Sequence, residues 1–142
     1  MRRVKAQRTD SFQAITLPLA GLRVLVVEDE GLIGLAVENF LEQFGCQIVG
    51  LAGSTSDALQ IIRTAAIDVA VVDVKLENET AYALADALIA ANLPFIFATG
   101  LTANEIDQRY SHVPVVGKPF EEGELRGALL EAIAGRVWRP TQ

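Results

Sequence analysis

Three carboxylates, a hydroxyl and an ammonium each stand close to the end of a short apolar segment of this sequence. They are Glu28, Asp29, Asp73, Thr99 and Lys118. Clustered carboxylates repel one another and raise one another's pKa unless a cation joins them. Carboxylate oxygens, together with a backbone carbonyl and waters, suit Mg²⁺. The set therefore indicates a divalent metal site, provided that the fold brings these residues together.

The same set could also bind a phosphoryl group. Lys118 supplies a positive charge for a tetrahedral anion, and Thr99 supplies a hydroxyl donor for one of its oxygens. With a divalent metal present, the charge of a transferring phosphoryl group is neutralised on three sides, and one carboxylate is left free as the nucleophile.

The segment that positions Asp73 is the most informative part of the chain. Residues 69–75 begin with apolar, mostly β-branched side chains and run directly into the acid. A segment this apolar predicts a central strand of a parallel sheet, with Asp73 at its carboxyl end, where ligands of open α/β sheets bind. An isolated acid at this place would be interpreted as a loop or helix-cap residue. The other acids favour a site.

The remaining elements follow from apolar spacing and from turn residues. Strands are predicted at 22–27, 47–51, 69–75, 95–98 and 113–116, and helices at 32–44, 58–65, 81–91, 103–109 and 121–134. Residues 76–80 are predicted as a loop whose acids, Glu77 and Glu79, face solvent. Strands that alternate with helices predict an α/β fold, a parallel sheet with helices on both faces. Parallel strands end at one edge, so the five polar residues should meet there.

Length and composition predict one globular domain. The chain has 142 residues, of which 51% are hydrophobic. We expect a basic N-terminal extension over 1–20, a domain over 21–135 and a C-terminal tail over 136–142. No apolar run approaches the roughly 20 residues that span a bilayer, and no secretory segment follows the N-terminus. We therefore expect a cytoplasmic protein without a membrane partner, whose single cysteine, Cys46, is a core residue.

The charge distribution argues against nucleic-acid binding. The net charge is −6, but residues 1–20 hold four basic side chains and one acid, which leaves −9 for the remainder. An acidic body repels phosphate backbones, and four cations on an extension are weak evidence for such a partner. We expect a solvated extension.

Four motifs occur in a fixed order, each after an apolar strand: Val26-Val27-Glu28-Asp29, Val71-Val72-Asp73, Ala98-Thr99-Gly100 and Lys118-Pro119-Phe120. In this the chain resembles the receiver domain of bacterial two-component response regulators, over about residues 21–135. The resemblance implies a doubly wound, flavodoxin-like sheet with strand order 2-1-3-4-5. It implies that Asp73 is the phosphoacceptor, that Glu28, Asp29, Asp73 and the Lys75 carbonyl form the Mg²⁺ site, and that Thr99 and Lys118 contact the phosphoryl oxygens. It also implies a cis Lys118-Pro119 bond.

Residues 97–101, Phe-Ala-Thr-Gly-Leu, further resemble a receiver subgroup with a Phe-Ala-Thr-Gly signature, found in alphaproteobacteria, often standing alone and associated with stress signalling. The chain departs from the family pattern at three places. Val115 replaces the usual aromatic switch residue, Thr102 stands where the subgroup tends to have a tyrosine, and Glu77 stands where the family has a proline. Tyr110 and Phe120 are the nearest aromatic substitutes, and we interpret both as packing residues.

The resemblance predicts a response regulator that accepts a phosphoryl group on Asp73 from a histidine kinase, of which the histidine-tryptophan-glutamate class is a candidate, or from a phosphotransfer protein. We expect no conventional enzyme, only phosphorylation from a phosphodonor and autodephosphorylation, and an effect exerted through a downstream protein partner. Alternatives are a phosphate shuttle or sink and a phosphorylation-independent interaction module. A dehalogenase-like hydrolase would need a second acid at the position of Lys75, and flavin binding lacks a glycine-rich loop.

Overall fold

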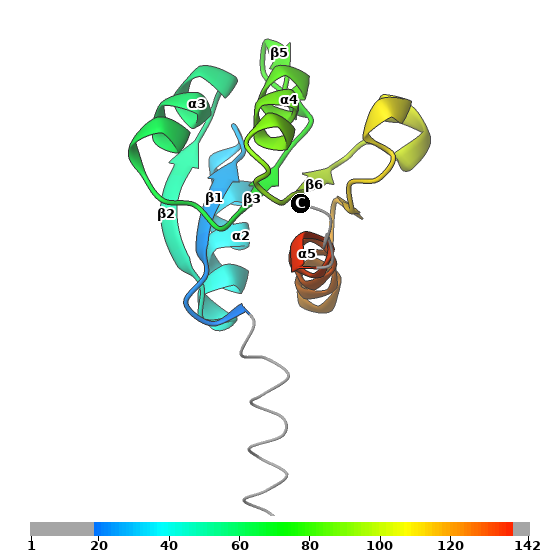
Figure 1. Ribbon diagram of the computed structural model, residues 1–142. Helices are drawn as coiled ribbons and strands as arrows, with labels where there is room; N and C mark the ends of the chain where they lie inside the picture. The colour runs from blue at the N-terminus through cyan, green and yellow to red at the C-terminus, as the bar shows by residue number, and fades with distance from the viewer. Residues whose placement is uncertain (1–18, 138–142) are drawn as a thin grey trace, which may run out of the picture.

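A five-stranded parallel sheet forms the centre of the molecule (Figure 1). The computed structural model describes residues 19–137, so most of the predicted extension and tail lies outside the described residues. The strands are β1 (Arg23–Val27), β2 (Gln47–Ala52), β3 (Val69–Val72), β6 (Phe95–Thr99) and β7 (Val115–Gly117). Their order across the sheet is β2-β1-β3-β6-β7, which confirms the predicted order 2-1-3-4-5.

Helices cover both faces of this sheet. They are α2 (Gly31–Gln43), α3 (Thr55–Thr64), α4 (Tyr82–Ala90) and α5 (Glu122–Val137). In Figure 1, α3 and α4 lie on one side of the strands, whereas α2 and α5 lie on the other. Local signals set the helix ends. Ser54 caps α3 by accepting a hydrogen bond from the Asp57 amide, and Gly45 follows α2 at φ 88°, a conformation that suits glycine.

The strand side chains alternate between two hydrophobic cores. In β1 and β3, Leu25 and Val72 pack in the core under α3 and α4, whereas Val26 and Val71 pack in the core under α2 and α5. Each of these four side chains is at most 2% exposed. Successive residues of a strand point to opposite faces, so strands covered on both sides must be apolar throughout. This is why their sequences show no polar alternation.

Two segments differ from the prediction. The expected helix at 103–109 is replaced by two 3₁₀ turns, η2 (Ala103–Glu105) and η3 (Gln108–Tyr110), so residues 19–137 form four α-helices rather than five. Ile106, between the turns, is extended at ψ 141°. The expected loop at 76–80 is part of an antiparallel hairpin, β4 (Lys75–Leu76) and β5 (Glu79–Thr80). Both departures leave the main sheet unchanged.

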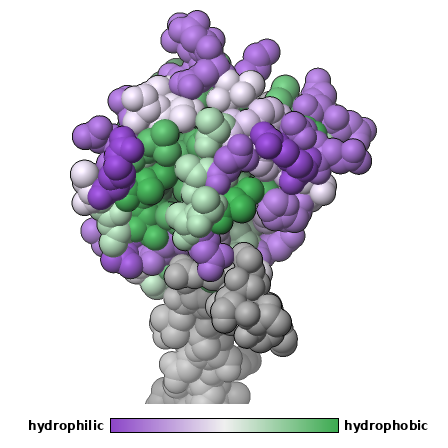
Figure 2. Space-filling model, turned by 45° about the horizontal axis from the view of Figure 1, so that its top comes forward, coloured by the Kyte–Doolittle hydropathy of each residue, from purple (hydrophilic) through white to green (hydrophobic). Residues whose placement is uncertain are grey.

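The apolar stripe of α2 is narrower than its sequence indicates. Gly34, Val37 and Leu41 are buried, but Leu32 and Leu35 are 85% and 53% exposed. Successive helical residues are about 100° apart, so Leu32 lies about 200° around the axis from Gly34 and cannot share its face. Figure 2 shows a further broad hydrophobic area on one face, with hydrophilic side chains around it.

The described residues contain no helix that is both long and apolar enough to cross a bilayer. Cys46 precedes β2 and is 8% exposed, which confirms its prediction as a core residue. Its thiol donates a hydrogen bond to the Leu19 carbonyl at 3.3 Å, and burial raises its pKa to about 11.

Candidate functional site

Glu28 and Asp29 follow β1 at the carboxyl edge of the sheet. The Glu28 amide donates to the Ala52 carbonyl at 2.9 Å, which continues the β1 and β2 pairing by one residue. One Glu28 carboxylate oxygen also accepts from the Glu30 amide at 3.1 Å. The Glu28 side chain is only 3% exposed. The two backbone hydrogen bonds and the burial of the side chain therefore fix the position of the Glu28 carboxylate.

Asp73 follows β3, the strand next to β1. Its amide donates to the Val27 carbonyl at 2.9 Å, so the ends of the two strands are locked in register. One of its carboxylate oxygens, Oδ1, accepts from the Lys75 amide at 3.2 Å. The side chain is 7% exposed. A buried carboxylate requires a partner, because the charged form loses its hydration.

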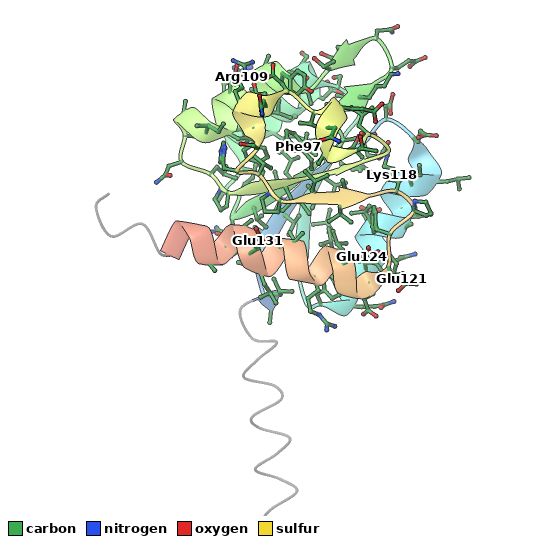
Figure 3. The ribbon with its side chains drawn as sticks, turned by 90° about the vertical axis from the view of Figure 1, so that its right-hand side faces the viewer. Phe97, Arg109, Lys118, Glu121, Glu124 and Glu131 are labelled. Atoms are coloured by element: carbon green, nitrogen blue, oxygen red, sulfur yellow. The ribbon has the colours of Figure 1, made fainter. Side chains whose placement is uncertain are left out.

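Lys118 provides that partner from the last strand of the sheet. Its ammonium lies 2.5 Å from Glu28 Oε1 and 2.8 Å from Asp73 Oδ2. Its backbone amide donates to the Thr99 carbonyl at 2.9 Å, and the bond to Pro119 is cis, as expected. Figure 3 shows Lys118 at the end of β7, on the side of the molecule where α5 begins; Glu121 lies just before this helix and Glu124 in its first turn.

Thr99 is the last residue of β6 and is fully buried. It pairs with Gly117 of β7, and its strand also borders β3, so it lies between the strand of Asp73 and the strand of Lys118. Its hydroxyl oxygen accepts from the Leu101 amide at 3.3 Å. The hydroxyl proton remains available as a donor.

The three acids fit a divalent metal. One carboxylate oxygen from each of Glu28, Asp29 and Asp73 lies within 4.8 Å of the others. Lys118 contacts one oxygen of Glu28 and one of Asp73, the second oxygen of each accepts a backbone amide, and Asp29 is partly exposed. Three carboxylates suit Mg²⁺, which prefers oxygen ligands and keeps several of its own waters.

Burial and ion pairing oppose each other at this site. Burial raises the pKa of Glu28, and the hydrogen bond from Lys118 offsets only part of that effect. Burial by itself would lower the pKa of Lys118, but the hydrogen bonds to Asp73 and Glu28 outweigh it, so the pKa is raised. The lysine therefore stays protonated and balances the two buried acids.

One contact in this region is not predicted from the sequence. Glu79 is exposed, as expected, but it lies in β5 rather than in a loop, and its Oε2 accepts a hydrogen bond from the Thr55 amide at 3.1 Å, in the first turn of α3. The cluster of cap candidates at 54–57 marked the start of that helix. Nothing in the local spacing indicates which distant acid reaches it.

Tyr110 is the last residue of η3 and packs against β6. It is 1% exposed, stacks on Tyr82 at 5.0 Å between ring centroids, and meets Phe97 edge to face at 6.0 Å. Its hydroxyl donates to Asp86 Oδ1 at 2.5 Å. The prediction that Tyr110 is a packing residue is confirmed. Val115, at the place of the usual aromatic, pairs with Phe97 in the sheet.

Comparisons with known proteins agree with this geometry. The model of the response regulator receiver domain matches residues 24–130. The transcriptional regulatory protein PdtaR of Mycobacterium tuberculosis is 26% identical over 116 residues, which cover 79% of this chain and 57% of PdtaR. The chain thus spans little more than half the length of that relative.

Solved structures add a more similar relative. The solution structure of SdrG from Sphingomonas melonis Fr1 has a TM-score of 0.72 and 36% identity, and the match covers 80% of this chain and 97% of SdrG. The BeF₃-activated conformation of SdrG, from Pseudomonas melonis Fr1, has a TM-score of 0.71 and the same identity, with 80% and 98% covered. Since the family model matches most of the chain, this protein belongs to the response regulator receiver domain family.

Proposed function

We propose that this protein is a Mg²⁺-dependent phosphoacceptor that takes a phosphoryl group from a phosphorylated histidine onto Asp73. The observation that carries the proposal is the placement of Lys118, which follows β7 and reaches Asp73, two strands away in the sheet, and Glu28, three strands away. This geometry disfavours a vestigial acidic edge, because two buried acids are kept in direct contact with a largely buried ammonium. A site that binds a transferring phosphoryl group requires charged groups that are already in place, as Lys118 is here.

The transfer step needs little movement of the protein. A carboxylate oxygen of Asp73 attacks phosphorus, an O–P bond forms and the N–P bond of the donor breaks. The leaving imidazole nitrogen keeps the electron pair and takes up a proton from solvent. Lys118 then moves from the carboxylate to a phosphoryl oxygen, and the Thr99 hydroxyl donates to another. In the later hydrolysis, water attacks phosphorus, the O–P bond to Asp73 breaks, and inorganic phosphate and the Asp73 carboxylate are released while a proton passes to solvent.

A bound Mg²⁺ would be held by Glu28, Asp29, Asp73 and the Lys75 carbonyl, and would neutralise phosphoryl charge as a Lewis acid. The phosphoryl group adds about −1.5 to −2 charges at the sheet edge. Thr99 and Lys118 respond to that charge from opposite ends of the segment 100–117. The conformational change should therefore be largest in η2 and η3.

We infer that the phosphodonor is a histidine kinase or a phosphotransfer protein, and that the phosphorylated face binds a downstream protein in the cytoplasm. The signature at 97–101 supports a kinase of the histidine-tryptophan-glutamate class. SdrG, at 36% identity, has a BeF₃-activated conformation, which supports a phosphoryl-responsive site at the matching place of this chain.

Intact-mass spectrometry after incubation with acetyl phosphate tests the proposal. Wild type with Mg²⁺ should gain the mass of one phosphoryl group, whereas Asp73→Asn and a sample containing EDTA should not. Equal gain in wild type and Asp73→Asn would refute Asp73 as the acceptor. No gain in any sample would favour a phosphorylation-independent interaction module.

A further inference from the structure

The hairpin that follows Asp73 is tied to a distant helix by one of its own acids. In this hairpin Lys75 pairs with Thr80, and Leu76 pairs with Glu79. The Glu79 carboxylate accepts the Thr55 amide of α3 at 3.1 Å. Thr55 is the first residue of the helix, so this amide has no partner within the helix.

The start of α3 also lies beside the acids that follow β1. The Ala52 carbonyl accepts the Glu28 amide, and a Cβ added at Gly53 would lie 3.9 Å from the Asp29 Cα. The turn 52–55 therefore touches the segment of Glu28 and Asp29 directly. Through Glu79 it holds the segment of Asp73 and Lys75 as well.

Two side chains accept hydrogen bonds from the amides that have no partner within the helix at its start. Ser54 accepts the Asp57 amide, and Glu79 accepts the Thr55 amide. A carboxylate is well suited to this position, because it meets the positive end of the helix dipole. Thr55 Oγ1 is buried without a hydrogen-bond partner among residues 19–137, so the amide supplies the bond between Thr55 and Glu79.

We propose that Glu79 is a positioning residue for the metal site, because it ties the hairpin that presents Lys75 to the turn beside Asp29, in addition to the strand pairing that already holds Asp73 beside β1. The inference rests on the proposed function, in which Asp29 and the Lys75 carbonyl bind the same ion. Glu79 itself touches neither the ion nor the phosphoryl group. It acts through the hairpin that presents Lys75.

The chain offers a matched control on the same hairpin. Glu77 stands two residues before Glu79, carries the same charge and is exposed, and within residues 19–137 it makes no hydrogen bond or ion pair. Removing either acid changes the long-range charge near the site by the same amount. Only the Glu79 variant removes the bond to α3. A difference between the two therefore reports on position and not on charge.

The experiment is calorimetric titration of each variant with Mg²⁺ alone. Glu79→Ala should weaken Mg²⁺ binding three- to tenfold relative to wild type. Glu79→Gln, whose amide oxygen can accept the same bond, should recover to within about twofold of wild type, and Glu77→Ala should match wild type. Equal dissociation constants in Glu79→Ala and Glu77→Ala would overturn the proposal, and so would Glu79→Gln being as weak as Glu79→Ala.

A variant of Thr55, the donor of the same hydrogen bond, provides a second test in case Glu79→Ala misfolds. Thr55→Pro removes the donor amide at the first helical position, where proline is well tolerated, and Ser54 before it is extended as proline requires. Thr55→Pro should weaken Mg²⁺ binding as much as Glu79→Ala does, and the double variant should be no weaker than either. Additive effects would contradict a shared bond. Absence of Mg²⁺ binding in wild type would instead overturn the proposed function, and this inference with it.

Discussion

The ammonium of Lys118 lies 2.8 Å from a carboxylate oxygen of Asp73, although 45 positions separate the two residues in the chain. The same ammonium contacts Glu28, and all three side chains are at most 14% exposed. Lys118 is therefore the counterion of the acidic site, and in the proposed function the same ammonium would contact the phosphoryl group on Asp73. The stability of the folded protein and the proposed phosphoryl transfer therefore depend on the Lys118 side chain.

Loss of that counterion should destabilise the protein. Lys118→Met leaves two buried carboxylates unpaired, and removing one partner of a buried ion pair costs about 3–5 kcal/mol. We expect the lower end, about 3 kcal/mol, because the acids can bind protons. Urea unfolding in EDTA measures the change. Mg²⁺ should restore more stability to Lys118→Met than it adds to wild type, since it replaces the missing charge.

The matched control is Lys75→Met, since Lys75 is exposed and forms no ion pair within residues 19–137. Its free energy of unfolding should stay within about 0.5 kcal/mol of wild type. Equal destabilisation by both substitutions would show that total charge, not the local contact, matters.

Lys75→Ala should change the lifetime of the phosphoryl group on Asp73 more than the yield of phosphorylation. The Lys75 backbone amide that contacts Asp73 is kept in the variant. The side chain is exposed beside the acceptor, where water must approach. Decay of the phosphorylated protein after removal of the phosphodonor gives the lifetime. Indistinguishable decay rates in the two proteins would refute the prediction.

Tyr110→Phe should destabilise the protein by about 1.5–3 kcal/mol, the usual contribution of a hydrogen bond to a charged group. The substitution keeps the ring against Phe97 and Tyr82 but removes the bonds to Asp86 Oδ1 and to the Tyr82 carbonyl. Thermal unfolding followed by circular dichroism measures it. An unchanged melting temperature would mean that solvent replaces the hydroxyl's partners at no cost.

The ionisation of Tyr110 predicts how stability changes in alkaline solution. Burial, reinforced by Asp86, raises its pKa to about 12, whereas a tyrosine in an unfolded chain has a pKa of about 10. Between these values the folded state holds a proton that the unfolded state has lost. The free energy of unfolding therefore falls as pH rises from about 10 to about 12. Tyrosinate absorbance should show this late ionisation in Tyr82→Phe, in which Tyr110 is the one remaining tyrosine.

Cys46 should react slowly with iodoacetamide in the folded protein. Its pKa of about 11 leaves little thiolate at pH 8, and its side chain is buried. Mass spectrometry should show rapid labelling only after denaturant is added. Fast labelling of the native protein would contradict the packing of the turn between α2 and β2.

The polar residues at the strand ends could be predicted because each follows an apolar strand, and parallel strands bring their carboxyl ends to one edge. Asp73 and Lys118 meet for this reason, although their contact depends on a strand order that the family resemblance supplied. The strands themselves were readable from their continuous apolar runs. Helix faces were less certain, as Leu32 shows, because a wide apolar stripe does not reveal which part of it the sheet covers.

The Glu79 bond and the packing of Tyr110 could not be predicted, because both depend on contacts distant in sequence. Glu79 needs the start of α3, and Tyr110 needs Tyr82 and Asp86 of α4. Short polar segments satisfy several local patterns almost equally well. Tertiary contacts then decide between a helix, a turn and a hairpin.

The central claim is that Asp73, the metal ligands and Lys118 form one site that holds a metal ion and a phosphoryl group together. Fluorine NMR with beryllofluoride, a tetrahedral stand-in for a phosphoryl group on a carboxylate, tests it directly. Signals of bound fluoride are expected in wild type only when Mg²⁺ is present, and none are expected in Asp73→Asn. The same bound signals in Asp73→Asn, or in wild type without Mg²⁺, would contradict it.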